Sequence, residues 1–170
     1  MKAIEIGGVI MSVDTSENII QEQTAGEVED VISTERFLTF TSDGLTIGVS
    51  TNYVTEIITN HTITMLPLVP GYVRGIINLR GQIIPIIDIR QRMGKMPIDF
   101  TSTTCIIVLN IDSISIGIIV DNVQQVMDID REQISAVPAE NQQELINGMI
   151  SSGERSVILF LDCEQLIQTY

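Results

Sequence analysis

The sequence predicts a mainly β protein, and three observations lead to that prediction. Of the 170 residues, 60 are Ile, Val or Thr, whereas Leu and Ala together number only 14. β-Branched side chains fit a pleated surface, while a helical bundle is built from Ala and Leu. Short apolar runs alternate with turn residues at a spacing of about 8–12 residues, as in all-β barrels. The third observation is an internal repeat, described below.

Six apolar runs are expected to form strands, at 37–41, Leu45–Ser50, 82–87, Cys105–Ile111, Ile114–Val120 and Ser156–Leu161. The pair Asp43-Gly44 predicts a tight hairpin turn between the first two, and Asp112-Ser113 predicts a weaker one between the fourth and fifth. Pro85 removes a backbone donor, so its strand is expected to lie at a sheet edge or to carry a bulge. Residues 3–11 are expected to add one short strand.

Short helices are expected near 88–93 and 164–168. Asp88 and Asp162 each precede one of them, directly after a predicted strand. An Asp in that place usually caps the helix with its side chain. We therefore interpret the two carboxylates as helix caps and not as a catalytic pair.

The part of the chain that follows residue 34 repeats itself, at an offset that drifts only from 69 to 74 residues. The aligned pairs are Gly48 with Gly117, Val54 with Val123, Ile57 with Val126, Gly75 with Gly148 and Asp88 with Asp162. The repeat predicts two copies of one module of about 65 residues, over about 35–100 and 101–170. Modules of that size have marginal cores alone, so they are expected to pack together and to leave a groove where a partner can bind.

The acidic charge is unevenly distributed. The net charge is −13. Residues 1–34 contain seven acids and a single base, Lys2, and an eighth acid, Glu35, follows directly. The remaining residues carry 14 acids against 8 bases. We expect residues 1–34 to form a mobile acidic arm and residues 35–170 to form the folded domain.

Composition also argues against several classes of protein. An acidic chain lacks the basic footprint of a nucleic-acid binder, and its apolar runs are far shorter than the ~20 residues that span a bilayer. Cys105 and Cys163 lie inside apolar runs and are expected to be reduced, buried thiols in a cytosolic protein. His61 is the only histidine, so a catalytic site is not expected. Asp128, Asp130 and Glu132 lack the spacing of a calcium loop, and neither a metal nor a cofactor is expected.

A basic band interrupts the acidic sequence. It contains Arg74, Arg80, Arg90, Arg92 and Lys95 against one acid, Asp88. Arg80 lies in Asn78-Leu-Arg-Gly81, where a turn can present its guanidinium to carboxylates or carbonyls of a partner. The alternative is a solvated charge or an internal pair with Asp88.

The segment from Val73 to Arg90, read as VRGIINLRGQIIPIIDIR, resembles the signature of the CheW family of chemotaxis coupling proteins. The resemblance extends over about residues 35–168 and includes VTEI at Val54–Ile57 and IGIIVDNV at 116–123. It implies two SH3-like, five-stranded β-barrels packed side by side, in agreement with the repeat. The acidic N-terminal arm is longer than the N-terminus typical of that family.

The resemblance also implies a function. Such a chain is a non-catalytic adaptor in the cytoplasm that joins the cytoplasmic hairpin tips of methyl-accepting chemoreceptors to the regulatory domain of a chemotaxis histidine kinase. It is recruited to membrane-bound receptor arrays without inserting into the membrane or binding nucleic acid. By matched position, the partner-binding residues are Val54, Glu56, Ile57, Gly75, Asn78 and Arg80, with Val123 and Val126 as their counterparts in the second module.

Other functions remain open on the sequence. The same coupler fold could serve another motility or signalling system, such as the control of type IV pili. A small enzyme would need convergent polar groups in a pocket. A homo-oligomeric structural protein could form through exposed strand edges.

Overall fold

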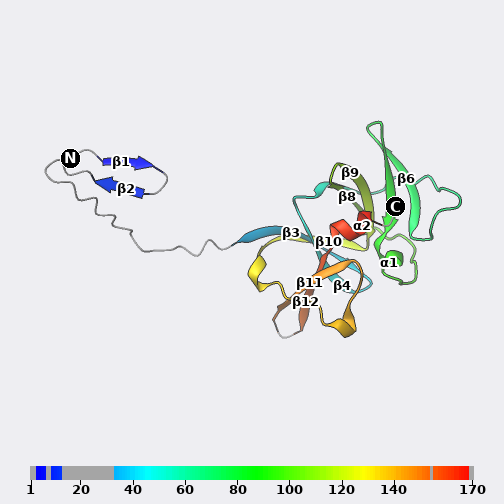
Figure 1. The fold of residues 1–170 in the computed structure, drawn as a ribbon. Coiled ribbons are helices and arrows are strands. Elements are labelled where there is room, and N and C mark those ends of the chain that lie inside the picture. The colour runs from blue at the N-terminus through cyan, green and yellow to red at the C-terminus, as the bar shows by residue number, and fades with distance from the viewer. Residues whose placement is uncertain (1–2, 7–8, 13–32, 154, 169–170) are drawn as a thin grey trace. The chain divides into compact units, whose positions relative to one another are not determined.

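The computed structural model describes residues 3–6, 9–12, 33–153 and 155–168 (Figure 1). The chain divides into two compact units, Met1–Ile32 and Ser33–Tyr170, which we describe separately. In the first, β1 (Ala3–Ile6) pairs antiparallel with β2 (Val9–Ser12). The single strand expected over 3–11 is therefore a hairpin. Residues 13–32 of the predicted acidic arm lie outside the described residues.

The second unit is built from ten strands and two short α-helices in its described residues. The strands are β3 (Thr34–Ser42), β4 (Leu45–Ser50), β5 (Val54–Ile58), β6 (Val73–Leu79), β7 (Gln82–Asp88), β8 (Cys105–Ile111), β9 (Ile114–Val120), β10 (Asn122–Asp130), β11 (Ile146–Ser152) and β12 (Ser156–Leu161). The helices are α1 (Ile89–Arg92) and α2 (Cys163–Ile167), and 3₁₀ turns η1 (Arg131–Gln133) and η2 (Ala139–Asn141) follow β10.

These strands form two five-stranded sheets. One has the order β5-β8-β9-β7-β6, and a bridge between Thr64 and Ile76 brings the segment after β5 onto β6, at the opposite edge. The other has the order β10-β3-β4-β12-β11, and Ser135 bridges to Met149 in the same way. Each bridge joins the two edges of its sheet and so closes it into a barrel, called here barrel I and barrel II respectively. The expected pair of SH3-like barrels is confirmed.

Each barrel takes strands from both halves of the sequence. The hairpin β3-β4 comes from the first repeat but lies in barrel II, and the hairpin β8-β9 comes from the second repeat but lies in barrel I. A division at about residue 100 therefore separates the two sequence repeats but not the two barrels. Neither residues 35–100 nor residues 101–170 alone supply all five strands of one barrel. A periodic pattern predicts strands, but it does not say which sheet a hairpin joins.

The aligned glycines Gly48 and Gly117 each lie beside a large side chain of the neighbouring parallel strand. A Cβ on Gly48 would lie 3.2 Å from a ring carbon of Phe160, on the neighbouring β12. A Cβ on Gly117 would lie 2.5 Å from Cδ1 of Ile86, on the neighbouring β7. Ile86 and Phe160 are themselves aligned in the repeat, so each repeat's glycine receives the large side chain of the other.

The core has three parts because the central strands are buried on both faces. A large cluster takes side chains from both barrels, including Leu38 and Phe40 of β3 and Ile107 and Leu109 of β8. Smaller clusters fill barrel I, around Ile84, and barrel II, where the rings of Phe37 and Phe160 meet edge to face at 4.7 Å. The shared cluster holds the barrels against each other, since burying each large aliphatic side chain contributes about 1.5–3 kcal/mol.

Most of the local predictions are confirmed. All six expected strands and both expected helices are present, and the Asp43-Gly44 and Asp112-Ser113 loops have the positive φ angles of type I′ turns. Asp88 and Asp162 accept hydrogen bonds from backbone N–H groups of α1 and α2, as helix caps do. Asp130 caps η1, so its cluster is a turn.

Two expectations need correction or extension. The edge position expected for the strand of Pro85 is wrong, because β7 lies between β6 and β9. Its parallel pairing with β9 begins only at Ile86, so Pro85 precedes that ladder. Both cysteines are free, but Cys105 is only half-buried, whereas burial raises the pKa of the Cys163 thiol to about 12.

Candidate partner-binding site

Arg80 lies at the tip of the β6-β7 hairpin. The two-residue loop Arg80-Gly81 has φ angles of 52° and 86°, which fit a type I′ turn. The side chain of Asn78 accepts a hydrogen bond from the backbone N–H of Gly81 at 2.9 Å, and this closes the turn. The sequence NLRG therefore builds a rigid tip that holds the guanidinium of Arg80 in solvent, where 75% of its side chain is exposed.

Glu56 fixes the direction of that guanidinium. Both Nη atoms of Arg80 donate to the two carboxylate oxygens of Glu56, each at 2.9 Å. Hydrogen bonding to Glu56 raises the pKa of Arg80, and the charge of Glu56 adds to it. Glu56 belongs to β5 and Arg80 to the β6-β7 hairpin, so the pair joins the two edge regions of barrel I. The two residues are 24 apart in sequence, and no local motif signals their pairing.

The other predicted residues of barrel I differ in exposure. Ile57 is 43% exposed and follows Glu56 on β5. Val54, at the start of β5, packs against the core shared by the barrels. Gly75 is buried with φ of 138°, and a Cβ there would lie 2.1 Å from the carbonyl oxygen of Thr64. Gly75 thus supports the barrel closure and does not present a side chain to a partner.

Val123 and Val126 lie on β10 of barrel II. Val123 packs against the shared core, as Val54 does, while Val126 is 53% exposed. The predicted set therefore consists of two groups, six residues on barrel I and two on barrel II. Only the barrel I group carries charge.

The basic band does not form a free cationic surface. Arg90 pairs with Asp43 and Asp121, Arg92 pairs with Glu144, and Lys95 lies 3.7 Å from Asp43. Arg74 stacks over the ring of Phe100 at 5.6 Å. Asp88 is no partner of these side chains, because it caps α1. Arg80 is the arginine of the band with a strongly exposed side chain, so among these arginines it has the most solvent-accessible guanidinium.

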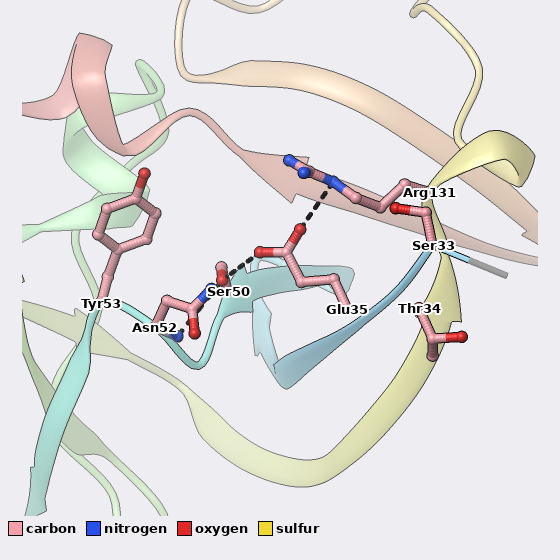
Figure 2. A pocket seen from close by; sticks show the side chains of 7 residues that line it. All are labelled: Ser33, Thr34, Glu35, Ser50, Asn52, Tyr53 and Arg131. Carbon is pink, nitrogen blue, oxygen red and sulfur yellow. Dashed lines mark hydrogen bonds and ion pairs between the residues drawn. The ribbon is translucent and has the colours of Figure 1, made fainter. Parts of the chain in front are cut away.

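The sequence did not predict a polar pocket of about 390 Å³ in barrel II (Figure 2). It is lined by Ser33, Thr34, Glu35, Ser50, Asn52, Tyr53 and Arg131. Glu35 lies at its centre, accepts a hydrogen bond from the Ser50 hydroxyl and pairs with Nε of Arg131 at 2.8 Å. Glu35 therefore links β3 to Ser50 at the end of β4 and to Arg131 in η1. The sequence places Glu35 at the border of the acidic arm and predicts no such contacts for it.

Tyr53 stands at one side of this pocket. Burial raises the pKa of its hydroxyl, and the nearby Cys163, Glu164, Asp112 and Glu35 raise it further. The hydroxyl therefore stays protonated and can donate a hydrogen bond. Among residues 33–153 and 155–168, no three His, Cys, Asp or Glu side chains gather as metal ligands, and no described helix could cross a bilayer.

Comparison with known proteins agrees with this architecture. Residues 36–170 match the family model of the CheW-like domain. The chain is 33% identical to the chemotaxis protein CheW of Klebsiella aerogenes over 138 residues, covering 79% of this chain and 82% of that protein. It is 26% identical to CheW of Thermotoga maritima, covering 82% and 91%. Protein FrzA of Myxococcus xanthus is 25% identical, covering 79% and 86%.

A solved structure extends the likeness to three dimensions. The scaffolding protein TtCheW of Thermoanaerobacter tengcongensis superposes with a TM-score of 0.73 at 28% identity, covering 79% of this chain and 92% of that one. The family model covers both barrels except the first two residues of β3, and it includes the hairpin that carries Arg80. With the paired barrels and the relatives in agreement, the chain belongs to the CheW-like domain family and is a chemotaxis scaffold of that kind.

Proposed function

We propose that this chain is a non-catalytic adaptor that joins methyl-accepting chemoreceptors to a chemotaxis histidine kinase. The receptors would bind through their cytoplasmic hairpin tips and the kinase through its regulatory domain. Membership of the CheW-like family supports this role, as does the scaffolding function named for the Thermoanaerobacter relative. Binding would recruit the chain to receptor arrays.

The observation that carries the proposal is the exposed pair of Arg80 and Glu56. An exposed ion pair contributes at most about 1 kcal/mol to folding, so stability alone gives little reason for its two-bond geometry. Two parallel N–H···O bonds do orient the guanidinium, and its exposed side chain keeps donor capacity for a partner. Arg80 would donate to carbonyl or carboxylate oxygens of the bound protein.

Apolar side chains near the pair would supply the contact area. Ile57 follows Glu56 directly, and Val126 is its counterpart on barrel II. Val54 and Val123, at the start of the two strands, are partly buried and pack against the shared core. An amphipathic receptor helix could lay its apolar face on such residues, with Arg80 setting its orientation.

Regulation requires no chemical step. Receptors would change kinase activity if the adaptor binds the kinase-on and kinase-off arrangements with different affinity, since a ligand shifts an equilibrium only through that difference. Gly75 and Asn78 would act indirectly, because they hold the barrel closure and the turn that position Arg80.

The direct test is assembly of a three-part complex. Vesicles that carry the receptor cytoplasmic domain are mixed with the kinase regulatory domain, with and without this chain, and the bound fractions are measured by sedimentation. The proposal predicts that the kinase domain sediments only when the chain is present, and that Arg80→Ala lowers the fraction. Equal sedimentation without the chain contradicts the proposal.

A further inference from the structure

Arg90, at the start of α1, forms a cluster of four charges with Asp43, Asp121 and Lys95. The Arg90 side chain is only 12% exposed, and its Nη1 donates to Asp43 at 2.6 Å while its Nη2 donates to Asp121. The Asp121 carboxylate also accepts the backbone N–H of Asp43 at 2.9 Å. Lys95 adds a weaker contact with Asp43. One guanidinium thus holds two carboxylates together.

The three partners belong to different parts of the fold. Arg90 follows β7 of barrel I, and Asp43 forms the β3-β4 turn of barrel II. Asp121 is the single residue between β9 of barrel I and β10 of barrel II. The Arg90 bridge therefore crosses from one barrel to the other, at the point where the chain itself crosses.

The pseudo-equivalent corner of the molecule has no such bridge. The repeat places Glu164 where the first corner has Arg90, Asp112 where it has Asp43, and Asn52 where it has Asp121. That corner holds two carboxylates near the Tyr53 hydroxyl and no guanidinium at the equivalent position. Across the described residues, the ion pairs that join the barrels come only from Arg90, Arg92 and Lys95. Loss of the Arg90 bridge would not be compensated from the second corner.

We propose that Arg90 is a positioning residue that fixes barrel II relative to barrel I. It does so through Asp121, which directly precedes β10, the strand that carries Val123 and Val126. Arg90 thereby keeps the barrel II half of the partner site in register with the half that carries Ile57 and Arg80. This consequence for binding rests on the proposed adaptor function, whereas the coupling between barrels does not.

The test measures coupling and binding separately. A ketone-bearing amino acid is introduced at Thr59, after β5, and at Gln133, in η1, both of them exposed. Spin labels attached there avoid the cysteines and report the distance between the barrels by electron double resonance. Arg90→Gln is expected to broaden or shift that distance distribution, because it removes the cation that holds the two carboxylates together and leaves Asp43 with only the weaker contact of Lys95. Receptor binding, measured on the unlabelled chain, is expected to weaken about tenfold, which corresponds to a loss of about 1.4 kcal/mol of binding free energy.

A matched control and a second variant complete the test. Arg36→Gln removes the same charge from an exposed pair with Asp128 inside barrel II, and it should change neither readout. Asp43→Asn removes one leg of the bridge at an exposed turn, and it should reproduce the broadening if Arg90→Gln fails to fold. Amide spectra of β11-β12 and β6-β7 should stay as in the parent chain, which a general loss of structure would not allow.

The outcomes distinguish the two proposals. An unchanged distance distribution in Arg90→Gln, or in Asp43→Asn where the first variant does not fold, overturns the positioning role whatever happens to binding. Failure of the parent chain to bind receptor and kinase overturns the proposed function and leaves the distance measurement to decide the coupling. A broadened distribution with unchanged receptor affinity contradicts the stated link between Arg90 and the partner site.

Discussion

The strands β5 and β10 are copies of one strand that carry different chemistry. Both have a register irregularity near their start, and both pack an early valine, Val54 or Val123, against the shared core. The partly exposed Glu56 of β5 holds Arg80, whereas its counterpart on β10 is the uncharged Gln125. The comparison shows that inward residues are constrained by packing in both copies, while outward residues are free to diverge. The two copies of the strand therefore differ in charge, while their packing against the core is alike.

The largest difference between the copies is expected at the glycines that close the barrels. Gly75→Ala should lower the free energy of unfolding by more than about 3 kcal/mol, since its Cβ would meet a backbone oxygen and its φ is unfavourable for alanine. Gly148→Ala should cost less, about 1–2 kcal/mol, because the nearest obstacle at 2.6 Å is a side-chain methyl of Ile134, the nearest backbone oxygen lies at 3.4 Å, and Gly148 does not have a positive φ. Urea unfolding monitored by circular dichroism measures both, and equal losses would contradict the difference.

The second largest effect is expected when the exposed apolar residues of β5 and β10 are replaced. Ile57→Asp and Val126→Asp are each expected to weaken receptor binding at least about tenfold, because a carboxylate would have to be desolvated in the contact. Val157→Asp is the matched control, since Val157 is similarly exposed on β12 and outside the predicted set. Titration of receptor fragments by fluorescence anisotropy gives the affinities. A loss for Ile57→Asp alone would restrict the site to barrel I, and no loss in either would place the site elsewhere.

The smallest effect on stability is expected at Arg80 itself. Arg80→Ala should change the free energy of unfolding by less than about 1 kcal/mol, as its pair with Glu56 is exposed. Arg36→Ala, which removes another exposed pair, should behave alike in the same urea experiment. A much larger loss at Arg80 would mean that the pair serves the barrel and not a partner.

The sequence predicts individual strands and turns, but it does not predict how the strands combine into barrels. Short, continuous apolar runs predict β3, β4, β7, β8, β9 and β12, because successive residues of these strands are buried. The strands β5 and β10 are half exposed and lack such a run, and β6 and β11 are interrupted by Gly75 and Gly148. Nothing in a linear repeat indicates that the β3-β4 and β8-β9 hairpins exchange barrels.

The same limit applies to the site. The turn around Arg80 could be predicted from NLRG, since Asn and Gly favour its backbone. Its partner Glu56 could not, because that pairing depends on how the edges of barrel I meet. Arg90 was grouped with Arg80 as part of one basic band, yet its guanidinium is enclosed between the two barrels. A run of like charges describes composition, and only the fold decides which member faces solvent.

The most direct test of the adaptor proposal is the activity of the histidine kinase in a reconstituted array. Receptor-bearing vesicles, the kinase and this chain are combined, and autophosphorylation is followed with and without attractant. The account predicts receptor control of the kinase with the parent chain, no control when the chain is omitted, and clearly weakened control with Arg80→Ala although that variant is folded. Full receptor control with Arg80→Ala would contradict the role given to that residue, and full control without the chain would contradict the adaptor function.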